Sequence, residues 1–396
     1  NNKQQSKQKI GGVHNIMMKI RIDGKELKGI IEKAVCNMNK KAGSPILRKV
    51  VLIDNGNDLK AYTTDMEGYL QISTRNYKSM ESGSIGIDEE DLKVLLKMNG
   101  DVLITELEDN ILVQNGKKSI SLCKYNISEF PDIPEATYTD VLQFSENEFQ
   151  ETINNLNTFT SDNENNKMMQ AIHFNINDSR VEALDGKRIG LRTIRDEEKI
   201  ANDGKICIHN MIVSDLKKVL DKKSKEPVVI SASDRYIKVS GKEFTYIQRR
   251  LEGEYFRVSQ MLTSDYDFSF KADTQGMLSH MKYYTDNVIG KNDCKLVIFN
   301  ISNDITTYGR NTRFEVSDTL EIKEHSGKDI TIAFNPYFIV DALKVADADE
   351  VVITGMNPKA PVFISGNKYS FIVLPVNIAP EEIKRMEKYL RKVKAA

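Results

Sequence analysis

The chain has 396 residues, of which 40% are apolar and 29% charged, and its net charge is −1. This composition excludes a disordered chain, and no apolar run approaches the roughly 18 residues that span a membrane. The nearly neutral net charge argues against a strongly basic nucleic-acid-binding protein, but it allows positive charge to be concentrated on one surface. The polar first residues show no secretory leader, and the four separated cysteines form no CxxC pair, so we expect a cytoplasmic protein with reduced thiols. These are Cys36, Cys123, Cys207 and Cys294.

Each third of the sequence opens with an amphipathic helix, as the helical spacing of its apolar residues indicates. The three helices are expected over residues 24–38, 146–159 and 273–288. A second helix follows in each third, with Asp88, Asn210 and Asn335 as the expected N-caps. Alternating strands with Asn-Gly, Ser-Gly and Gly-Asn turns close each unit as antiparallel hairpins.

A strand ending in a polar turn also recurs, as TTDMEGYLQIST (residues 63–74), ALDGKRIGLRTI (183–194) and, more loosely, TTYGRNTRFEVS (306–317). Asp65 and Asp185 are 120 residues apart, and Gly309 follows 124 residues later. That period is the size of a domain and too long for a solenoid unit. The sequence therefore predicts an α+β protein of three tandem domains, each with two helices packed on antiparallel sheets. We expect them over 18–139, 140–262 and 263–378.

The search for catalytic groups is mostly negative. No phosphate-binding loop, HExxH pair or GxSxG turn is present, and the five histidines lack ligand-like spacing, so neither a metal nor a cofactor is expected. The recurring Asp65 and Asp185 could form the acid/base pair of a hydrolase. A carboxylate that recurs at equivalent turns is more simply explained as the group that holds each turn together.

Lysines gather on the polar faces of the predicted helices. If the repeats place their helices around one axis, these lysines would line one surface and contact DNA phosphates without reading bases; a solvated helix face is the alternative. The candidates are Lys25, Lys28, Lys33, Lys93, Lys97, Lys217, Lys218 and Lys282, with Lys40, Lys41, Lys222, Lys223 and Lys344 nearby.

Several segments in the same order and spacing resemble the bacterial DNA polymerase III β subunits, the replicative sliding clamps. They include MKIRIDGKELKGII, SPILRKVVL, FPDIP, LDGKRIGL, LEGEYFRVSQML, AFNPYFIVDALKVADADEVVI and YSFIVLPV, and the match runs from Met18 to Ile378. The resemblance implies a head-to-tail homodimeric ring that encircles duplex DNA and is opened by an ATP-driven clamp loader. It implies a non-catalytic protein, any polymerase or 3′–5′ exonuclease activity belonging to the holoenzyme. A clamp-fold paralogue of DNA repair or a mobile element is the alternative.

The resemblance also implies an apolar pocket, between the second and third domains, for short motifs of the polymerase α subunit, the clamp loader and repair proteins. Carried over by matching segments, it would comprise Met169, Leu184, Gly186, Lys187, Arg188, Ile189, Phe256, Gln260, Met261, Pro361, Ile372, Leu374, Pro375 and Val376. Leu184, Phe256 and Gln260 depart from the usual family residues, so the peptide preference is less defined than the location. Some of these residues, such as Ile189 and Ile372, could instead belong to the domain cores.

The ring-closing interface implied by the family would pair a first-domain edge strand, with Ile120 and Leu122, against Tyr283 and Tyr284 of a second copy. Both ends of the chain extend past the resemblance. Residues 1–17 are a natural extension or a tag, and residues 379–396 carry a helical stripe of apolar residues with six basic and three acidic residues. We expect an amphipathic helix there that docks beside the peptide pocket, with a solvated helix as the alternative.

Overall fold

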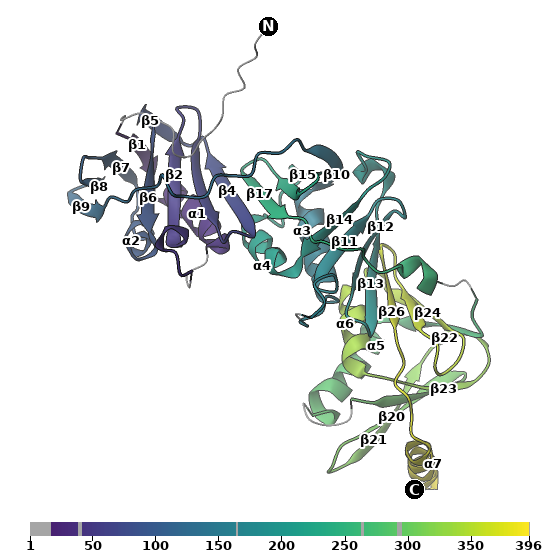
Figure 1. Ribbon diagram of the computed structural model, residues 1–396. Helices are drawn as coiled ribbons and strands as arrows, with labels where there is room; N and C mark the ends of the chain where they lie inside the picture. The colour runs from purple at the N-terminus through teal and green to yellow at the C-terminus, as the bar shows by residue number, and fades with distance from the viewer. Residues whose placement is uncertain (1–16, 39–41, 164, 263–264, 291–294, 396) are drawn as a thin grey trace. The chain divides into compact units, whose positions relative to one another are not determined.

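The computed structural model describes residues 17–38, 42–163, 165–262, 265–290 and 295–395. One order of elements occurs three times along the chain: a strand, a helix, a group of strands, a second helix and three closing strands (Figure 1). All of the sheets are antiparallel where their strand pairing is described, as one strand pair from each repeat illustrates. The predicted α+β class with a threefold repeat is therefore confirmed.

The first repeat begins with a helix whose apolar face and cap both follow from the sequence. The Asp23 side chain caps α1 by accepting from the Lys25 amide at 2.8 Å, and Leu27, Ile30 and Ile31 are buried on one face. The elements are β1 (Lys19–Asp23), α1 (Gly24–Ala34), β2 (Lys49–Asp54), β3 (Leu59–Thr64), β4 (Gly68–Thr74), β5 (Tyr77–Glu81), β6 (Gly83–Asp88), α2 (Glu89–Leu95), β7 (Asp101–Glu106), β8 (Asn110–Asn115) and β9 (Lys118–Cys123).

Among the described residues, the second repeat has one strand fewer than the first. Its elements are β10 (Thr139–Ser145), α3 (Glu146–Asn157), β11 (Ala171–Asn175), β12 (Arg180–Leu184), β13 (Arg188–Thr193), β14 (Lys205–His209), α4 (Asn210–Val219), β15 (Pro227–Ala232), β16 (Tyr236–Ser240) and β17 (Phe244–Arg249). A single bridge from Leu142 to Lys199 stands where the first repeat pairs β1 with β5. A 3-10 turn, η4 (Val258–Met261), follows the repeat.

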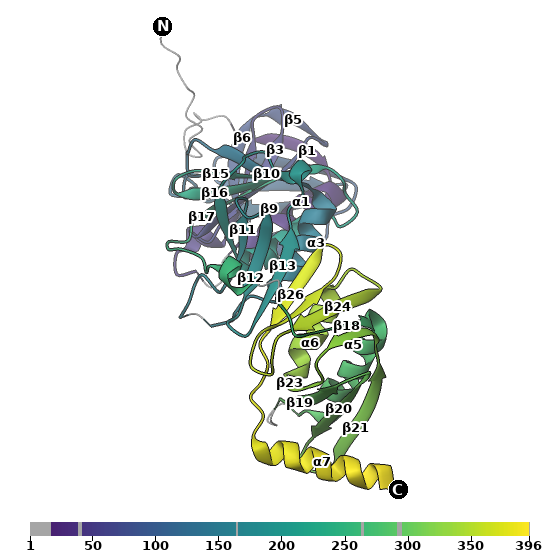
Figure 2. The ribbon, with the colours of Figure 1, turned by 90° about the vertical axis from the view of Figure 1, so that its right-hand side faces the viewer.

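Among the described residues, the third repeat has the same number of strands as the first. Its elements are β18 (Phe268–Asp273), α5 (Thr274–Tyr283), a π-helical turn η5 (Tyr284–Val288), β19 (Val297–Ile301), β20 (Asp304–Arg310), β21 (Glu315–Glu321), β22 (Lys323–Gly327), β23 (Ile330–Phe334), α6 (Pro336–Val345), β24 (Glu350–Gly355), β25 (Val362–Ser365) and β26 (Tyr369–Val373). The predicted helix over 273–288 is thus divided into α5 and η5. A further helix, α7 (Pro380–Ala395), follows (Figure 2).

Two of the predicted N-caps are confirmed and one differs. The Asp88 side chain accepts from the Glu90 amide at 3.2 Å, and that of Asn335 accepts from the Tyr337 amide at 3.1 Å. Asn210 instead lies within α4, and its side-chain amide donates to the Ser161 carbonyl at 3.3 Å. The predictions for residues 1–16, Lys40, Lys41 and Cys294 fall outside the described residues.

Two of the sheets each combine strands from two neighbouring repeats. The eight-stranded sheet has the order β10-β15-β16-β17-β4-β3-β2-β6, and the nine-stranded sheet the order β14-β11-β12-β13-β26-β25-β24-β18-β22. The remaining sheets are β5-β1-β7-β8-β9 and β21-β20-β19-β23. Contacts accordingly group the chain into two compact units: residues 1–151, 196–206 and 211–252 in the first, and 152–195, 207–210 and 253–396 in the second. The predicted boundaries at residues 139 and 262 stay a prediction.

Candidate functional site

The recurring polar turns share one hydrogen-bond arrangement. One carboxylate oxygen of Asp65 accepts from the Glu67 and Gly68 amides at 3.0 and 2.8 Å. Asp185 accepts in the same way from the amides two and three residues on, at 2.9 and 3.0 Å. In the third repeat Asn311 takes this role, accepting from the amides of the residues two and three positions on. The third equivalent position is therefore Asn311, two residues beyond the Gly309 expected from the sequence.

These bonds give the repeated turns a structural explanation. An Asx side chain that accepts from two backbone amides replaces the hydrogen bonds that the turn itself lacks. An amide serves as well as a carboxylate there, as Asn311 illustrates, which a shared acid/base role would not permit. Within the described ranges no group of three or more His, Cys, Asp and Glu side chains could hold a metal ion. The hydrolase hypothesis is therefore not favoured.

Four apolar side chains of the predicted pocket region form a row across the nine-stranded sheet. Leu184 of β12 pairs with Ile189 of β13, Ile189 pairs with Ile372 of β26, and Ile372 pairs with Phe363 of β25. Cross-strand partners in register lie on the same face of a sheet. The pairing of β13 with β26 thus joins apolar residues of the second and third repeats on one face. Leu184, Ile189 and Ile372 are buried, so the expectation that some of these residues belong to a core holds for them.

The segment after β17 packs on this row. Tyr255, Phe256 and Leu262 are partly buried hydrophobic residues against it, and Val258 is buried within the same cluster. The Tyr255 and Phe256 rings meet edge to face, with centroids 5.7 Å apart. Met169 also packs on the cluster, so the surface combines rigid strand residues with an adaptable methionine. We call it the apolar platform: Met169, Leu184, Ile189, Leu191, Tyr255, Phe256, Val258, Leu262, Phe363 and Ile372.

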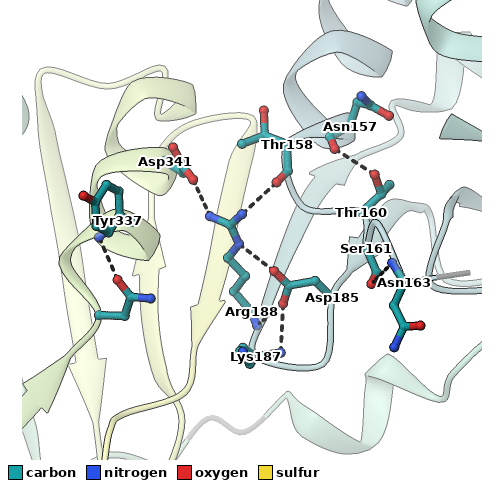
Figure 3. Close-up of polar contacts among 11 residues, drawn as sticks. Asn157, Thr158, Thr160, Ser161, Asn163, Asp185, Lys187, Arg188, Tyr337 and Asp341 are labelled. Atoms are coloured by element: carbon teal, nitrogen blue, oxygen red, sulfur yellow. Dashed lines mark hydrogen bonds and ion pairs between the residues drawn. The ribbon is translucent and has the colours of Figure 1, made fainter. Parts of the chain in front are cut away.

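Arg188 fixes the turn beside the apolar platform (Figure 3). Its guanidinium forms ion pairs with Asp185 of the same turn, at 3.0 Å, and with Asp341 of α6, at 2.5 Å. It also donates to the Thr158 carbonyl at 2.9 Å and lies over the Phe338 ring, 4.7 Å from its centroid. Because its guanidinium is engaged by these groups, Arg188 positions the turn, and its predicted place in the pocket wall stays a prediction.

The other predicted pocket residues are not members of the apolar platform. Leu374 and Met261 are 41% and 49% exposed, and Gln260 and Lys187 are also exposed. The Leu374 amide donates to the Lys187 carbonyl at 3.0 Å, which holds the chain after β26 along the turn. Gly186, with φ of 84°, brings the backbone of that turn close to the Met169 thioether. The half-buried members of the set are Pro361, Pro375 and Val376.

A separate polar cleft lies in the first unit, along residues 134–139, with a volume of about 840 Å³. Its lining includes Arg235, Tyr236 and Arg250 and contains none of the residues predicted for the peptide pocket or for DNA binding. The predicted site and this cleft are therefore different features of the chain.

Sequence reasoning missed Leu191, Tyr255, Val258, Leu262 and Phe363. Three of them lie in the segment LEGEYFRVSQML, where the resemblance points only to three of their neighbours. Phe363 lies in the short apolar run over residues 362–364, in which the sequence does not show which side chain faces which side of the sheet.

The predicted DNA-contacting lysines are mostly exposed. Two of them have acidic neighbours on their own helices: Lys93 donates to Glu90 at 2.7 Å, and Lys28 lies 3.7 Å from Glu32. Lys33 is half-buried, and the exposed members are Lys25, Lys28, Lys93, Lys97, Lys217, Lys218 and Lys282.

One of these lysines influences a half-buried carboxyl group. Burial raises the pKa of Asp215, on α4, to about 6, and the positive charge of Lys218 opposes part of that rise. The carboxyl therefore changes its charge within the pH range in which the protein can be studied.

The residues predicted at the interface between copies divide into two groups. Ile120 is half-buried and Leu122 is buried, both on β9, which ends its five-stranded sheet. Tyr283 is 49% exposed, but Tyr284 is fully buried, with its hydroxyl 2.9 Å from that of Thr307. Tyr284 therefore belongs to the core of the second unit, which corrects its predicted surface role.

The helix α7 does not lie on the apolar platform. Met386 is buried against Ile298, Tyr308 and Ala333 of the four-stranded sheet, with Tyr389 and Leu390 beside it. The expected docking of this segment beside the peptide pocket is therefore wrong, because its apolar stripe is used by a different sheet. No helix in the described ranges is long and apolar enough to cross a membrane.

Comparisons with known proteins agree with this architecture. A family model described as the central domain of the DNA polymerase III β subunit matches residues 143–256. The β sliding clamp of Staphylococcus epidermidis is 22% identical over 288 residues, which cover 69% of this chain and 74% of that protein. The β sliding clamp of Staphylococcus aureus is 20% identical over 281 residues, with the same coverage.

The solved structures that match cover more of the chain. A putative DNA polymerase III β subunit from Eubacterium rectale has a TM-score of 0.85 and 28% identity, covering 91% of this chain and 100% of that one. A DNA polymerase sliding clamp from Bacillus subtilis, 17% identical, shares the fold with a TM-score of 0.84 over the same proportions. The threefold repeat and these likenesses define a protein of the DNA-clamp fold. Residues 143–256 match the central domain of the DNA polymerase III β subunit, and the chain is similar in fold to bacterial β subunits over 91% of its length.

Proposed function

We propose that the chain is a DNA sliding clamp: two copies join head to tail into a ring that encircles duplex DNA and tethers the replicative polymerase. One observation carries the proposal, the threefold repeat of the clamp element order over the length that matches solved clamps. A ring that holds DNA topologically needs neither a catalytic group nor a cofactor, and the ATP chemistry of loading would belong to a separate clamp loader.

The interface between copies would join two strands that each end a sheet. β9 is the terminal strand of one sheet, and β21 is the terminal strand of another. Terminal strands present unpaired backbone donors and acceptors, which a second chain can satisfy by extending the sheet. Because each copy supplies one strand of each kind, two such pairings join two copies into a closed ring.

The exposed lysines of α1, α2, α4 and α5 would contact the DNA backbone. Contacts of this kind are independent of sequence and weaken as salt rises. We expect the double substitution K25E/K28E to reduce loading onto circular DNA several-fold without lowering the melting temperature, because both side chains are exposed. K78E/K359E, which changes two exposed lysines outside the helices by the same charge, is the control and should load normally. Equal loading by all three proteins would contradict the assignment of these lysines.

The apolar platform would bind short motifs of the polymerase α subunit, the clamp loader and repair proteins. Exposed Met261 and Leu374 at its rim can cover apolar side chains of a bound peptide. We expect M261E/L374E to weaken binding of a clamp-motif peptide about 10-fold or more, since each change places a charge in an apolar contact. M356E, at a methionine with 40% exposure in the β24–β25 loop, is the control. Unchanged affinity in M261E/L374E, measured by fluorescence anisotropy, would contradict this location.

A further inference from the structure

The helix α7 is anchored at the start of β21. Met386 is buried at 4% exposure on the four-stranded sheet, and Tyr389 packs on Tyr308 with ring centroids 5.7 Å apart. Polar contacts fix the direction of the helix, since Arg385 pairs with Glu315 and the Tyr389 hydroxyl donates to the Glu315 carbonyl at 3.1 Å. Glu315 is the first residue of the terminal strand β21. The helix is therefore attached at the N-terminal end of β21, which is the edge strand of the four-stranded sheet (Figure 2).

One flank of α7 is basic and lies on the β21 side. Residues three, four and seven apart share a face of a helix, so Lys392 lies on the same flank as Arg385 and Tyr389, which contact Glu315. Lys388 is three residues from Arg385 and four from Lys392, and it lies next to them on the side toward solvent. Both lysines are exposed. The basic flank, Lys388 and Lys392, thus begins at the contact with β21 and extends toward solvent, away from the face of α7 that packs on the sheet.

An acidic turn stands at the corresponding end of β9. β8 pairs with β9 so that Asn110 is opposite Cys123, the last residue of β9. Glu108 and Asp109 immediately precede Asn110 in the turn from β7, and both are exposed. Glu106 in the same region is already paired with Lys124 at 2.9 Å. The acidic turn, Glu108 and Asp109, therefore lies at the C-terminal end of β9, the edge strand of the five-stranded sheet.

Antiparallel pairing of the two edges brings these opposite charges together. It places the Cys123 end of β9 beside the Glu315 end of β21, and therefore the acidic turn beside the basic flank. At the other end it places Lys117 and Lys118 near Glu321. Parallel pairing would instead set the acidic turn beside Glu321, where like charges repel.

The geometry points to α7 as a part of the interface between copies: its basic flank binds the acidic turn of a second copy of this chain. The inference rests on the proposed dimeric ring and adds to it a charged contact beyond the strand pairing. Complementary charges at the rim of an interface fix its register and raise the rate of correct association. The contact would therefore select the antiparallel register in which the ring closes.

A charge-reversal cycle on the full chain tests the inference. The dissociation constant of the dimer is measured by fluorescence-detected sedimentation over a dilution series for the unaltered protein, K388E/K392E, E108K/D109K and the combined variant. Each double reversal should weaken the dimer about 3- to 30-fold, because it removes two rim charge pairs and adds repulsion. The combined variant should recover most of the loss, which isolates the coupling of the two sites. The differences should vanish near 1 M salt, where the Debye length is about 3 Å.

The matched control is K359E/K394E, which makes the same change of charge at two exposed lysines outside the basic flank. Lys394 is six residues from Lys388 and two from Lys392, so it lies on the other side of α7, and this control should leave the dissociation constant unchanged. Circular dichroism of each variant checks that α7 stays folded.

Two results would overturn the inference, and they can be told apart. Unaltered protein that remains monomeric at every concentration would overturn the dimeric ring and the α7 contact with it. A dimer whose affinity is equal in all variants, or is reduced equally by the control, would overturn the α7 contact alone and leave the ring intact.

Discussion

Replacement of Arg188 by alanine should destabilise the second unit, because this side chain joins the β12–β13 turn to α6. The guanidinium is 11% exposed and pairs with two carboxylates, Asp185 and Asp341, whose side chains are 16% and 27% exposed. Removing it would leave both carboxylates partly buried without their cation, and the Thr158 carbonyl would lose its donor.

The expected loss of unfolding free energy is about 3 kcal/mol. Breaking a buried ion pair by removing one partner costs about 3–5 kcal/mol, and the partial exposure of Asp341 favours the lower end of that range. R188K should recover less than half of the loss, because an ammonium cannot reproduce the planar fork that reaches two carboxylates and a carbonyl. K187A is the matched control, with a cost below about 0.5 kcal/mol, since the Lys187 side chain is exposed and only its backbone takes part in the turn.

Urea unfolding followed by far-ultraviolet circular dichroism suits this chain, which contains no tryptophan. Hydrogen exchange at the β13 amides then assigns the change to the second unit. A loss in R188A below about 1 kcal/mol, or full recovery in R188K, would refute the role assigned to the guanidinium. Because the turn carries Gly186 and leads into Ile189, R188A should also weaken peptide binding at the apolar platform.

Three further changes have expected results that follow from single contacts. Met66 and Gly186 occupy the same turn position with φ of 78° and 84°, a conformation that glycine adopts more readily than other residues. M66G should therefore stabilise the protein by up to about 1 kcal/mol, and G186A should destabilise it by a similar amount. Urea midpoints that move the other way would contradict this. Burial raises the pKa of Asp215 to about 6 in the folded protein, against about 3.9 when unfolded, so its contribution to stability falls as pH rises from about 4 to about 6. D215N should therefore be the more stable protein at about pH 7.5 but not at about pH 4, whereas D203N, at an exposed residue, should be neutral at both; a pH-independent difference would contradict it. Deleting residues 380–396 should lower the melting temperature by uncovering an apolar sheet face yet leave clamp-motif peptide affinity unchanged, and a changed affinity would contradict the separation of α7 from the peptide site.

The fold was predictable because its signals are local and occur three times. Apolar spacing defined α1 through Leu27, Ile30 and Ile31, and the Asx residues of the turns act as expected at Asp65 and Asp185. A repeat supplies three samples of one pattern, so the weak copy in the third repeat could be recognised from the two stronger ones.

The site was less predictable because it depends on pairings between distant segments. The register of Ile189 opposite Ile372 joins residues 183 positions apart and decides which apolar side chains share a face. The burial of Tyr284 depends on how η5 packs against Thr307, which no local pattern reports. For α7 the amphipathic stripe predicted a helix, but nothing in the stripe indicates which sheet accepts it.

Retention on closed and open DNA tests the ring most directly. The protein is loaded onto circular duplex DNA by a clamp loader, the free protein is removed, and half of the sample is cut once with a restriction enzyme. A topological ring remains on the closed circle and slides off the linear ends, at rates that depend little on moderate salt. Equal retention on both forms, with dissociation that accelerates steeply as salt rises, is the behaviour of an ordinary electrostatic binder and would contradict the proposal.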